Sequence, residues 1–580
     1  MNRVYYFVSG LLIVTFLYSC RDNKKETVTK EPIYNSQKIP IVEKMKAQEN
    51  FSLDEKIELY KKLKRDSTNK YNFENETELT MYGYSYLWNN EVADAIKVFQ
   101  LINSEFGSSN SFDNLGEAYQ LLGDTTLSIV NYQKSVEIDP NNFNAEDQIE
   151  KMRYPDKPQE KLSDKFDKVY TVEEYKNDLD QLGNKLLTIH PNSTKFISKA
   201  NLLQLIENKK ALITPQTTGG EFIWHCDEII ASINCSHTSF GSFSLEGNML
   251  PYVMGFPIEV RLINNHLFVI KTKNNADRIN IKDEIVSING VSVSDIISDS
   301  YKHLPSQGNI ITSKNNIFNV WAAAIIPYAL DFPETFTVQV KGKSEPISLR
   351  KSETYTDVVM DPTIKNCDNN LCLELVNKNT AILSISSFYY YRHDILPVFT
   401  KFIDSSMQVI NEKKIENLLV DVRANGGGAP EASIYLLRYL MDKPFTYFSK
   451  AEYKGKTEKT IEELPVVPFE NRFKGNKYFL IDGYGNSTTG HFMSLVKLHG
   501  LGPIVGEELG SNQFCSGGMI QTRLSNTKLK FWIATNTHET TAISLPDEVG
   551  ILPDHFISQS IDDYIQQKDV VKEFTLNLIK

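Results

Sequence analysis

The sequence predicts a multidomain protein in which an α-helical repeat module precedes a mixed α/β region. At 580 residues the chain exceeds what one hydrophobic core supports, so about three or four domains are expected. Apolar residues recur at helical spacing in residues 51–153, and buried strands alternate with helices from Thr380 onward. With 41% hydrophobic and 23% charged residues the composition is ordinary for globular proteins, so most of the chain should fold.

The first residues have the parts of an export signal. An apolar run from Val4 to Tyr18 follows Arg3 and ends at Ser19, and it is too short to span a bilayer comfortably. The sequence Leu17–Cys20 resembles a bacterial lipobox, which implies that Cys20 is lipidated and becomes the first residue. Residues 1–20 are therefore predicted to be a lipoprotein signal peptide that anchors the protein to a membrane of the bacterial cell envelope. An ordinary cleaved signal with a chance cysteine is the alternative.

Two segments follow the signal. Residues 21–50 are polar and without apolar periodicity, as expected of a flexible tether. Residues 51–153 contain an internal repeat that resembles the tetratricopeptide repeat, in which a glycine lets two helices approach closely. A helical spacer and a docking surface for a protein partner remain equally open. The matching positions, offset by 33 residues, are Gly83, Tyr86, Ala95 and Phe99 in the first copy and Gly116, Tyr119, Ser128 and Tyr132 in the second.

Charge and cysteine content narrow the classes of partner. The net charge of −11 has the wrong sign for a nucleic-acid binder, so no nucleic acid is expected. Beyond Cys20, Cys367 and Cys372 could close a small loop in an oxidising compartment, although spacing alone does not settle the pairing. No cysteine and histidine grouping has zinc-ligand spacing, so neither a metal nor a cofactor is predicted.

The middle of the chain changes from helices to strands. Residues 169–250 are predicted to be mainly helical and include Ser236-His237-Thr238 directly after a helix. Residues 251–352 are predicted to form a β-rich domain, because Pro257–Lys271 alternates apolar and polar residues as strands do. Within them Ile281–Gly290 resembles the signature of PDZ domains, which bind a peptide terminus as an added strand. The glycine-aspartate turn of that signature is Lys282-Asp283 here, so the match is partial.

Residues 353–580 contain the two sharpest local signals, each at the end of a predicted strand. Asn417–Gly428 is an apolar strand that ends in three glycines, which can present unscreened backbone N–H groups or form a plain turn. A second strand, Tyr478–Asp482, leads to Ser487 at the start of a helix. A serine there suits a nucleophile, because the helix dipole favours developing negative charge. It is also simply a good helix N-cap.

Together with Val505-Gly506-Glu507, these two segments resemble the catalytic domain of the S41 peptidases. The family includes the carboxy-terminal processing proteases, the tricorn core protease and interphotoreceptor retinoid-binding protein. The resemblance implies a crotonase-like α/β fold in residues 353–580, with a PDZ-like insert ahead of it. It also implies that Ser487 is the nucleophile and that the N–H groups of Gly426, Gly427 and Thr488 form the oxyanion hole.

The choice of general base depends on a difference between this sequence and the processing proteases. The processing proteases use a lysine in a short turn after the serine helix, and the corresponding turn here, Leu509–Gln513, has none. The tricorn branch takes a histidine from a His-Thr pair after a helix, which implies that His237 is the base. His491, one helical turn after the nucleophile, is a rival base. That branch also has a late acidic residue, for which Glu548 is preferred over Asp547.

The expected activity is therefore hydrolysis of peptide bonds in a peptide or protein substrate, through an acyl-enzyme formed by a serine and a histidine. Two alternatives belong to other classes of function. A catalytically silent protein of the same fold would bind a peptide or another ligand without cleaving it. In the second alternative the repeats and the PDZ-like module are the working parts, and the α/β domain is a scaffold.

Overall fold

The computed structural model divides into two compact units, with the boundary at Phe106. The predicted signal peptide with Cys20 lies outside the described residues. None of the helices in the described part of the chain is long and apolar enough to cross a membrane. The described residues are 39–66, 70–158, 160–244, 247–352, 361, 363–364, 367–391, 395–453 and 459–579.

Helices dominate the first unit. At Gly83 an added Cβ would lie 2.3 Å from the ring of Phe99, so only glycine lets the two helices that carry these residues approach this closely. The elements are β1 (Ile39–Pro40), α1 (Ile41–Lys46), α2 (Leu53–Asp66), β2 (Tyr71–Asn72), α3 (Glu76–Trp88) and α4 (Val92–Phe106).

The second unit begins with three more helices, α5 (Ser109–Leu122), α6 (Thr125–Ile138) and α7 (Phe143–Arg153). An added Cβ at Gly116 would lie 2.7 Å from the ring of Tyr132, as at the equivalent glycine of the first unit. The 33-residue repeat thus reflects the same close helix contact in each copy. That these helices are tetratricopeptide repeats stays a prediction.

A β-hairpin joins the last of these helices to the segment that contains His237. The hairpin consists of β18 (Ile520–Arg523) and β19 (Lys530–Ile533). Asp178 on α8 (Val172–Thr188) accepts hydrogen bonds from the backbone and side chain of Thr527, which lies in the turn of the hairpin. Arg523 pairs with Asp147 on α7. At the other edge, Trp532 and Ser239 exchange backbone hydrogen bonds of 2.9 and 3.1 Å.

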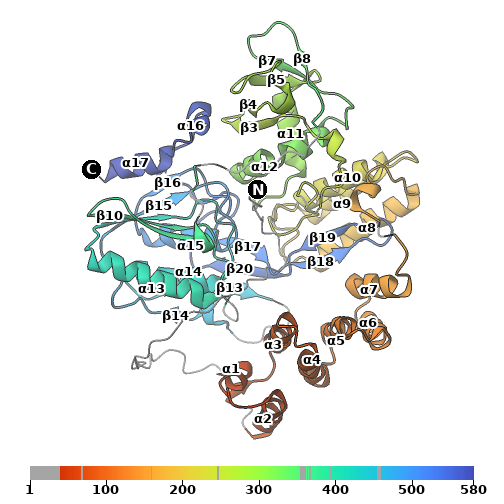
Figure 1. The fold of residues 1–580 in the computed structure, drawn as a ribbon. Coiled ribbons are helices and arrows are strands. Elements are labelled where there is room, and N and C mark those ends of the chain that lie inside the picture. The colour runs from red at the N-terminus through yellow and green to blue at the C-terminus, as the bar shows by residue number, and fades with distance from the viewer. Residues whose placement is uncertain are drawn as a thin grey trace. The chain divides into compact units, whose positions relative to one another are not determined.

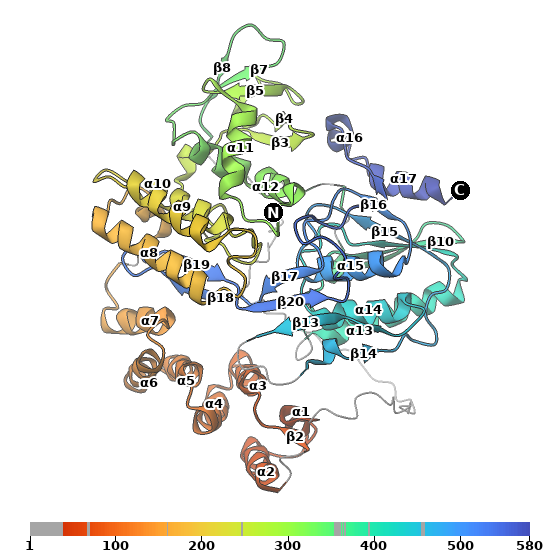
Figure 2. The ribbon, with the colours of Figure 1, turned by 180° about the vertical axis from the view of Figure 1, so that it is seen from behind.

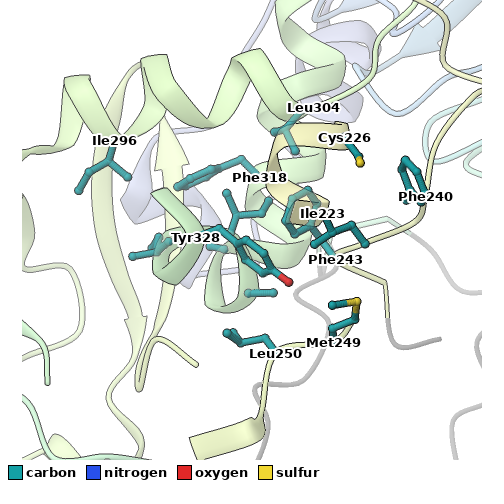
Figure 3. Close-up of a cluster of buried hydrophobic side chains, with 14 of the residues drawn as sticks. Ile223, Cys226, Phe240, Phe243, Met249, Leu250, Ile296, Leu304, Phe318 and Tyr328 are labelled. Carbon is teal, nitrogen blue, oxygen red and sulfur yellow. The ribbon is translucent and has the colours of Figure 1, made fainter. Parts of the chain in front are cut away.

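The helical segment and the following β-rich module share one hydrophobic core. Ile223 of α10 packs in the same cluster as Phe318 and Tyr328 of α12 (Figure 3). The predicted boundary near residue 250 therefore does not separate two independent cores. The helices of this region are α8 (Val172–Thr188), α9 (Lys199–Leu212), α10 (Gly219–Ala231), α11 (Val293–His303) and α12 (Ile311–Ala329).

The β-rich module is an antiparallel sheet in the order β3-β4-β5-β7-β8, with β6 paired to β5. Lys282 has a φ of 72°, so it takes the left-handed conformation that a glycine would occupy without strain. This explains how the partial signature still makes its turn. The strands are β3 (Glu259–Ile263), β4 (His266–Lys271), β5 (Glu284–Ile288), β6 (Val291–Ser292), β7 (Thr337–Val340) and β8 (Ile347–Ser348).

The α/β region is built on a six-stranded sheet in the order β21-β16-β15-β11-β10-β9, parallel except for β9. Val420 faces the core beneath α13, α14 and α15, whereas its neighbour Leu419 faces the core with α17, so both sheet faces are covered (Figure 1). The elements are β9 (Leu371–Leu375), β10 (Thr380–Ile385), α13 (Leu396–Glu412), β11 (Asn417–Asp421), α14 (Pro430–Leu440), β15 (Asn476–Ile481), α15 (Thr488–His499), β16 (Ile504–Gly506), β21 (His555–Phe556), α16 (Ile561–Ile565) and α17 (Val570–Leu578).

A smaller antiparallel sheet lies beside α15 (Figure 2). Its order is β13 (Phe448–Glu452), β20 (Asn536–Thr540) and β17 (Phe514–Gly517). Cys367 forms a disulfide with Cys372 on the edge strand β9 of the large sheet, which confirms the pairing considered from the sequence. The remaining short strands, β12 (Phe445–Thr446) and β14 (Pro465–Val466), pair with each other.

Candidate active site

Ser487 lies in a tight turn between β15 and α15, in a strained backbone conformation. Its φ of 54° and ψ of −121° lie outside the regions that a serine normally adopts. Although Ser487 is the residue ahead of the helix, its side chain makes no capping hydrogen bond. The hydroxyl therefore does not serve as a helix cap, and it is directed by the strained turn instead.

A buried thiol lies beside the Ser487 side chain. It belongs to Cys515 on β17, and Ser487 is among the groups that lower the pKa of this thiol. Burial, followed by the neighbouring Cys235, raises the pKa of the Cys515 thiol to about 12, so the thiol is neutral at physiological pH. A neutral thiol does not compete with the serine as a nucleophile. The sequence contained no motif that would have indicated this neighbour.

The glycine turn after β11 meets the nucleophile turn directly. A Cβ on Gly427 would lie 2.8 Å from Ser487 Cβ and 3.0 Å from the backbone nitrogen of Thr488, and its φ is 95°. Only glycine fits there. Its N–H donates to Asn425 Oδ1 at 2.9 Å. The N–H groups of Gly426 and Thr488, by contrast, have no acceptor among the described residues.

Asn425 is a buried residue that ties these two turns together. Its Oδ1 accepts hydrogen bonds from the Gly427 N–H and the Thr489 hydroxyl, at 2.9 and 2.8 Å. Its backbone oxygen accepts the N–H of Asn486. Sequence reasoning did not single out Asn425, although an asparagine directly before a glycine run was the available signal.

The segment containing His237 reaches the nucleophile turn through its neighbour. Ser236 Oγ donates a hydrogen bond of 3.0 Å to Asn486 Oδ1, 250 positions away, and lies 3.2 Å from His237 Nδ1. A hydroxyl has one proton, and the Ser236 hydroxyl uses it in the hydrogen bond to Asn486. His237 Nδ1 must then donate to Ser236, which leaves the lone pair on Nε2. Ser236 and Asn486 were both missed from the sequence, because only folding brings them together.

The electrostatic surroundings keep His237 neutral. Burial, followed by the neighbouring His538, lowers the pKa of His237 to about 4. At neutral pH the imidazole is therefore uncharged and able to accept a proton. No group of three or more metal-ligating side chains is arranged to hold a metal ion within the described ranges.

His491, the rival base, lies on α15, four residues after Ser487. It is 2% exposed, and neither ring nitrogen has a hydrogen-bond partner in the part of the chain that the structure describes. Its ring packs edge-on against Phe448, with the centroids 5.2 Å apart. Burial, followed by His538 and His237, lowers its pKa well below the usual value. A side chain enclosed in this way is poorly placed to exchange a proton with substrate.

The late acidic pair lies in a loop that is fixed mainly by its backbone. Glu548 is exposed, and its carboxylate has no partner among the described residues, whereas its backbone oxygen accepts the N–H of Asn309 at 2.7 Å. The Asp547 carboxylate accepts a hydrogen bond of 2.7 Å from Gln513 and pairs with Lys195 at 2.6 Å. The structure thus assigns neither carboxylate a contact with His237.

Asn512 belongs to the turn that has a lysine in the processing proteases. It is 1% exposed, and its amide donates to the backbone oxygens of Asp547 and Val549, both at 2.8 Å. Asn512 therefore holds the acidic loop in place. An amide nitrogen that donates twice cannot accept a proton, so this residue cannot replace the lysine as a base.

Part of the α/β region matches a known protein family. Residues 379–555, which include Ser487 and the glycine turn, match the model of Peptidase family S41. This is the family that the sequence resembles.

Similar proteins include several proteases. A tail-specific protease of Haemophilus influenzae is 26% identical over 203 residues, which is 33% of this chain and 27% of that protein. The chain thus spans little more than a quarter of that relative's length. Among solved structures, mature CPAF is 13% identical with a TM-score of 0.48, over 70% of this chain and 96% of that chain. The tricorn protease is 16% identical with a TM-score of 0.31, over 70% of this chain and 36% of that chain.

Proposed function

We propose that this protein is a serine peptidase that hydrolyses peptide bonds through an acyl-enzyme on Ser487. The observation that carries the proposal is the hydrogen bond from Ser236 to Asn486, because it joins the segment of the candidate base to the turn of the candidate nucleophile. The family match over residues 379–555 supports the same class of reaction.

In the proposed mechanism, His237 Nε2 accepts the proton of the Ser487 hydroxyl as its oxygen attacks the peptide carbonyl. The N–H groups of Gly426 and Thr488 stabilise the oxyanion, because they have no acceptor in the described structure. Gly427 allows the close approach of the two turns. The imidazolium then protonates the leaving amine, and a water molecule, deprotonated by the same histidine, releases the acyl group.

The proposed orienting group for His237 is Ser236 rather than Glu548. In this proposal Ser236 accepts the Nδ1 proton of the imidazole across their 3.2 Å contact, which selects the tautomer that a general base needs. The Glu548 carboxylate is exposed and has no partner among the described residues. The preference for Glu548 came from the family resemblance and stays an untested alternative.

Hydrolysis of a fluorogenic peptide library tests this proposal. Ser487→Ala and His237→Ala should each lower kcat by about 10⁴-fold or more, because serine and histidine act as one unit. Ser405→Ala on the exposed face of α13 and His266→Ala in the β-rich module are matched controls that should retain activity. Full activity of Ser487→Ala would contradict the proposal.

A catalytically silent binding protein is the second candidate. No carboxylate of the described residues contacts His237, and this favours the silent protein, since a base without a charged orienting group stabilises an imidazolium less well. This candidate predicts that the protein binds peptides but neither cleaves them nor reacts at Ser487.

The proposed location is the bacterial cell envelope, with a lipid anchor on Cys20. The apolar run and the lipobox-like sequence support it. Metabolic labelling with a fatty acid tests the anchor: Cys20→Ala should lose the label and leave the membrane fraction. Unchanged membrane association of an unlabelled Cys20→Ala variant would contradict lipidation as the anchor.

A further inference from the structure

Asp482, at the end of β15, is a largely buried carboxylate that the proposed mechanism does not use. One oxygen accepts the backbone N–H of Ala424 at 2.9 Å, and the other accepts the backbone N–H of Tyr484 at 3.1 Å. These two donors belong to different turns. Ala424 precedes the three glycines, and Tyr484 precedes the nucleophile in its own turn.

The Asp482 carboxylate lies where the pairing between strands β11 and β15 ends. β11 and β15 pair in parallel up to Asp421 and Leu480, and the Val422 N–H still bonds to the Leu480 oxygen. Beyond that bond the two chains separate into their turns. Asp482 links them there by accepting from both, so it continues the connection with a side chain where the regular ladder has ended.

Both turns contain strained residues that need such support. Ala424 has a φ of 57°, and Ser487 has a φ of 54°. Neither residue is a glycine, so each conformation persists only if its surroundings hold it. An ionised carboxylate can accept two N–H groups at once through charge-assisted bonds. A carboxylic acid or an amide offers one good acceptor oxygen for the same two donors.

No cationic side chain among the described residues forms an ion pair with Asp482. Arg423, whose charge acts to lower the pKa of Asp482, pairs with Asp421 on β11 and with Asp569 at the start of α17. A cleft of about 340 Å³, lined by Asp482 and by Glu507 after β16, gives solvent access to the carboxylate. On the remaining side α12 presents uncharged groups, Thr312 and Asn316, against Gly483, and β3 presents Arg261, which pairs with Asp361.

We propose that Asp482 is a positioning residue for the peptidase site, and that its ionised carboxylate holds the glycine turn and the nucleophile turn in their reactive arrangement. This inference rests on the proposed function of the Ser487 site. Asp482 touches neither the substrate nor the reacting atoms. It acts through the Ala424 and Tyr484 N–H groups, and so through the backbone that presents Gly426 and Ser487.

A pH dependence follows from this role. Burial raises the pKa of Asp482 to about 7, whereas the pKa of His237 is lowered to about 4. As the pH falls through 7, Asp482 gains a proton and loses its second acceptor, so activity should fall although the base is still neutral. If the base alone governed the acid limb, activity would persist to a pH near 4.

The kinetic test compares the wild type, Asp482→Asn and Glu507→Gln over the pH range. Asp482→Asn should lower kcat by about 10- to 100-fold at about pH 8 with little change in KM, and it should lose the acid limb near pH 7. Glu507→Gln is the matched control, because Glu507 shares the cleft and also has a pKa raised by burial but accepts no hydrogen bond from the turns. Glu507→Gln should retain both kcat and the acid limb of the pH profile.

Asp482→Glu, which restores a carboxylate, should recover part of kcat.

A second readout does not depend on turnover. Amide hydrogen exchange in the peptides that contain Ala424 and Tyr484 should be faster in Asp482→Asn than in the wild type, and the wild-type rates, corrected for the intrinsic pH effect, should rise below about pH 7. Wild-type exchange in Asp482→Asn, or a wild-type kcat with an unchanged acid limb, would overturn the positioning role. Faster exchange in a protein that cleaves no peptide would leave the structural link intact and would instead contradict the proposed function.

Discussion

Two regions beside the candidate site differ in what holds them: the pair of turns after β11 and β15, and the acidic loop that contains Asp547 and Glu548. The side chains of Asn425 and Asp482 tie the two turns to each other, because each accepts hydrogen bonds from both segments. The acidic loop is fixed mainly through its backbone oxygens, and the Glu548 side chain is exposed. Groups placed by a tightly held backbone are therefore defined before substrate binds, whereas the direction of the Glu548 side chain is not.

The largest expected loss of activity comes from adding a side chain where the two turns touch. Gly427→Ala should lower kcat by about 10²- to 10³-fold, because the new Cβ would lie 2.8 Å from Ser487 Cβ and displace the oxyanion donors. Steady-state kinetics with a fluorogenic peptide measures the loss. Gly426→Ala should lose much less, since its Cβ meets nothing within 4 Å. Equal losses in the two variants would show that the contact is unimportant.

The next effect concerns the orientation of the base. Ser236→Ala should lower kcat by about 10- to 100-fold, because His237 Nδ1 loses its acceptor and the productive tautomer is no longer selected. Ser236→Thr, which keeps the hydroxyl, should recover part of the activity. A wild-type kcat for Ser236→Ala, measured over the same pH range, would remove Ser236 from the mechanism.

Stability should respond to Asp482 in the sense opposite to activity. Its pKa is raised from 3.8 to about 7 in the folded protein, so between these values the folded state holds a proton that the unfolded state has released. This contribution is present in full below pH 3.8 and is lost as the pH rises to 7, at about 1.4 kcal/mol per pH unit.

Chemical denaturation of the wild type and Asp482→Asn at several pH values measures this contribution of Asp482 to the free energy of unfolding. The difference between their free energies of unfolding should change with that slope between pH 3.8 and about pH 7 and should be constant outside this range. A difference that does not vary with pH would show that Asp482 is ionised throughout the range.

The smallest effect is expected in the acidic loop. Glu548→Gln should change kcat by less than about threefold, because an exposed carboxylate without a partner contributes little. Asp547→Asn should affect thermal stability more than Glu548→Gln does, since it loses the pair with Lys195. A loss of two or more orders of magnitude in kcat for Glu548→Gln would show that Glu548 has the catalytic role implied by the family resemblance.

Much of the α/β region could be predicted from the sequence, because strands and helices leave periodic patterns. The predicted strand Tyr478–Asp482 overlaps β15, and the helix predicted from Ser487 begins at Thr488. The shared core of α10 and α12 could not be predicted, since it depends on how two distant segments pack. At Lys282 the turn formed without its usual glycine, which propensity alone does not indicate.

Within the candidate site, the sequence revealed the groups whose roles rest on backbone geometry. Gly427 and Ser487 stand out because a glycine run and a serine follow apolar strands. Ser236, Asn486 and Asp482 did not stand out, because their roles depend on side chains that meet only after folding. Motifs therefore indicate where chemistry occurs, and the structure is needed to show what orients it.

Covalent labelling tests the central claim most directly. A fluorophosphonate probe should form one adduct per molecule of the wild-type protein, and tandem mass spectrometry should locate it on Ser487. His237→Ala should react far more slowly, whereas His266→Ala, which alters an exposed side chain of the β-rich module, should react as the wild type does. An adduct on another residue, or full labelling of Ser487→Ala, would contradict the assignment of Ser487 as the nucleophile.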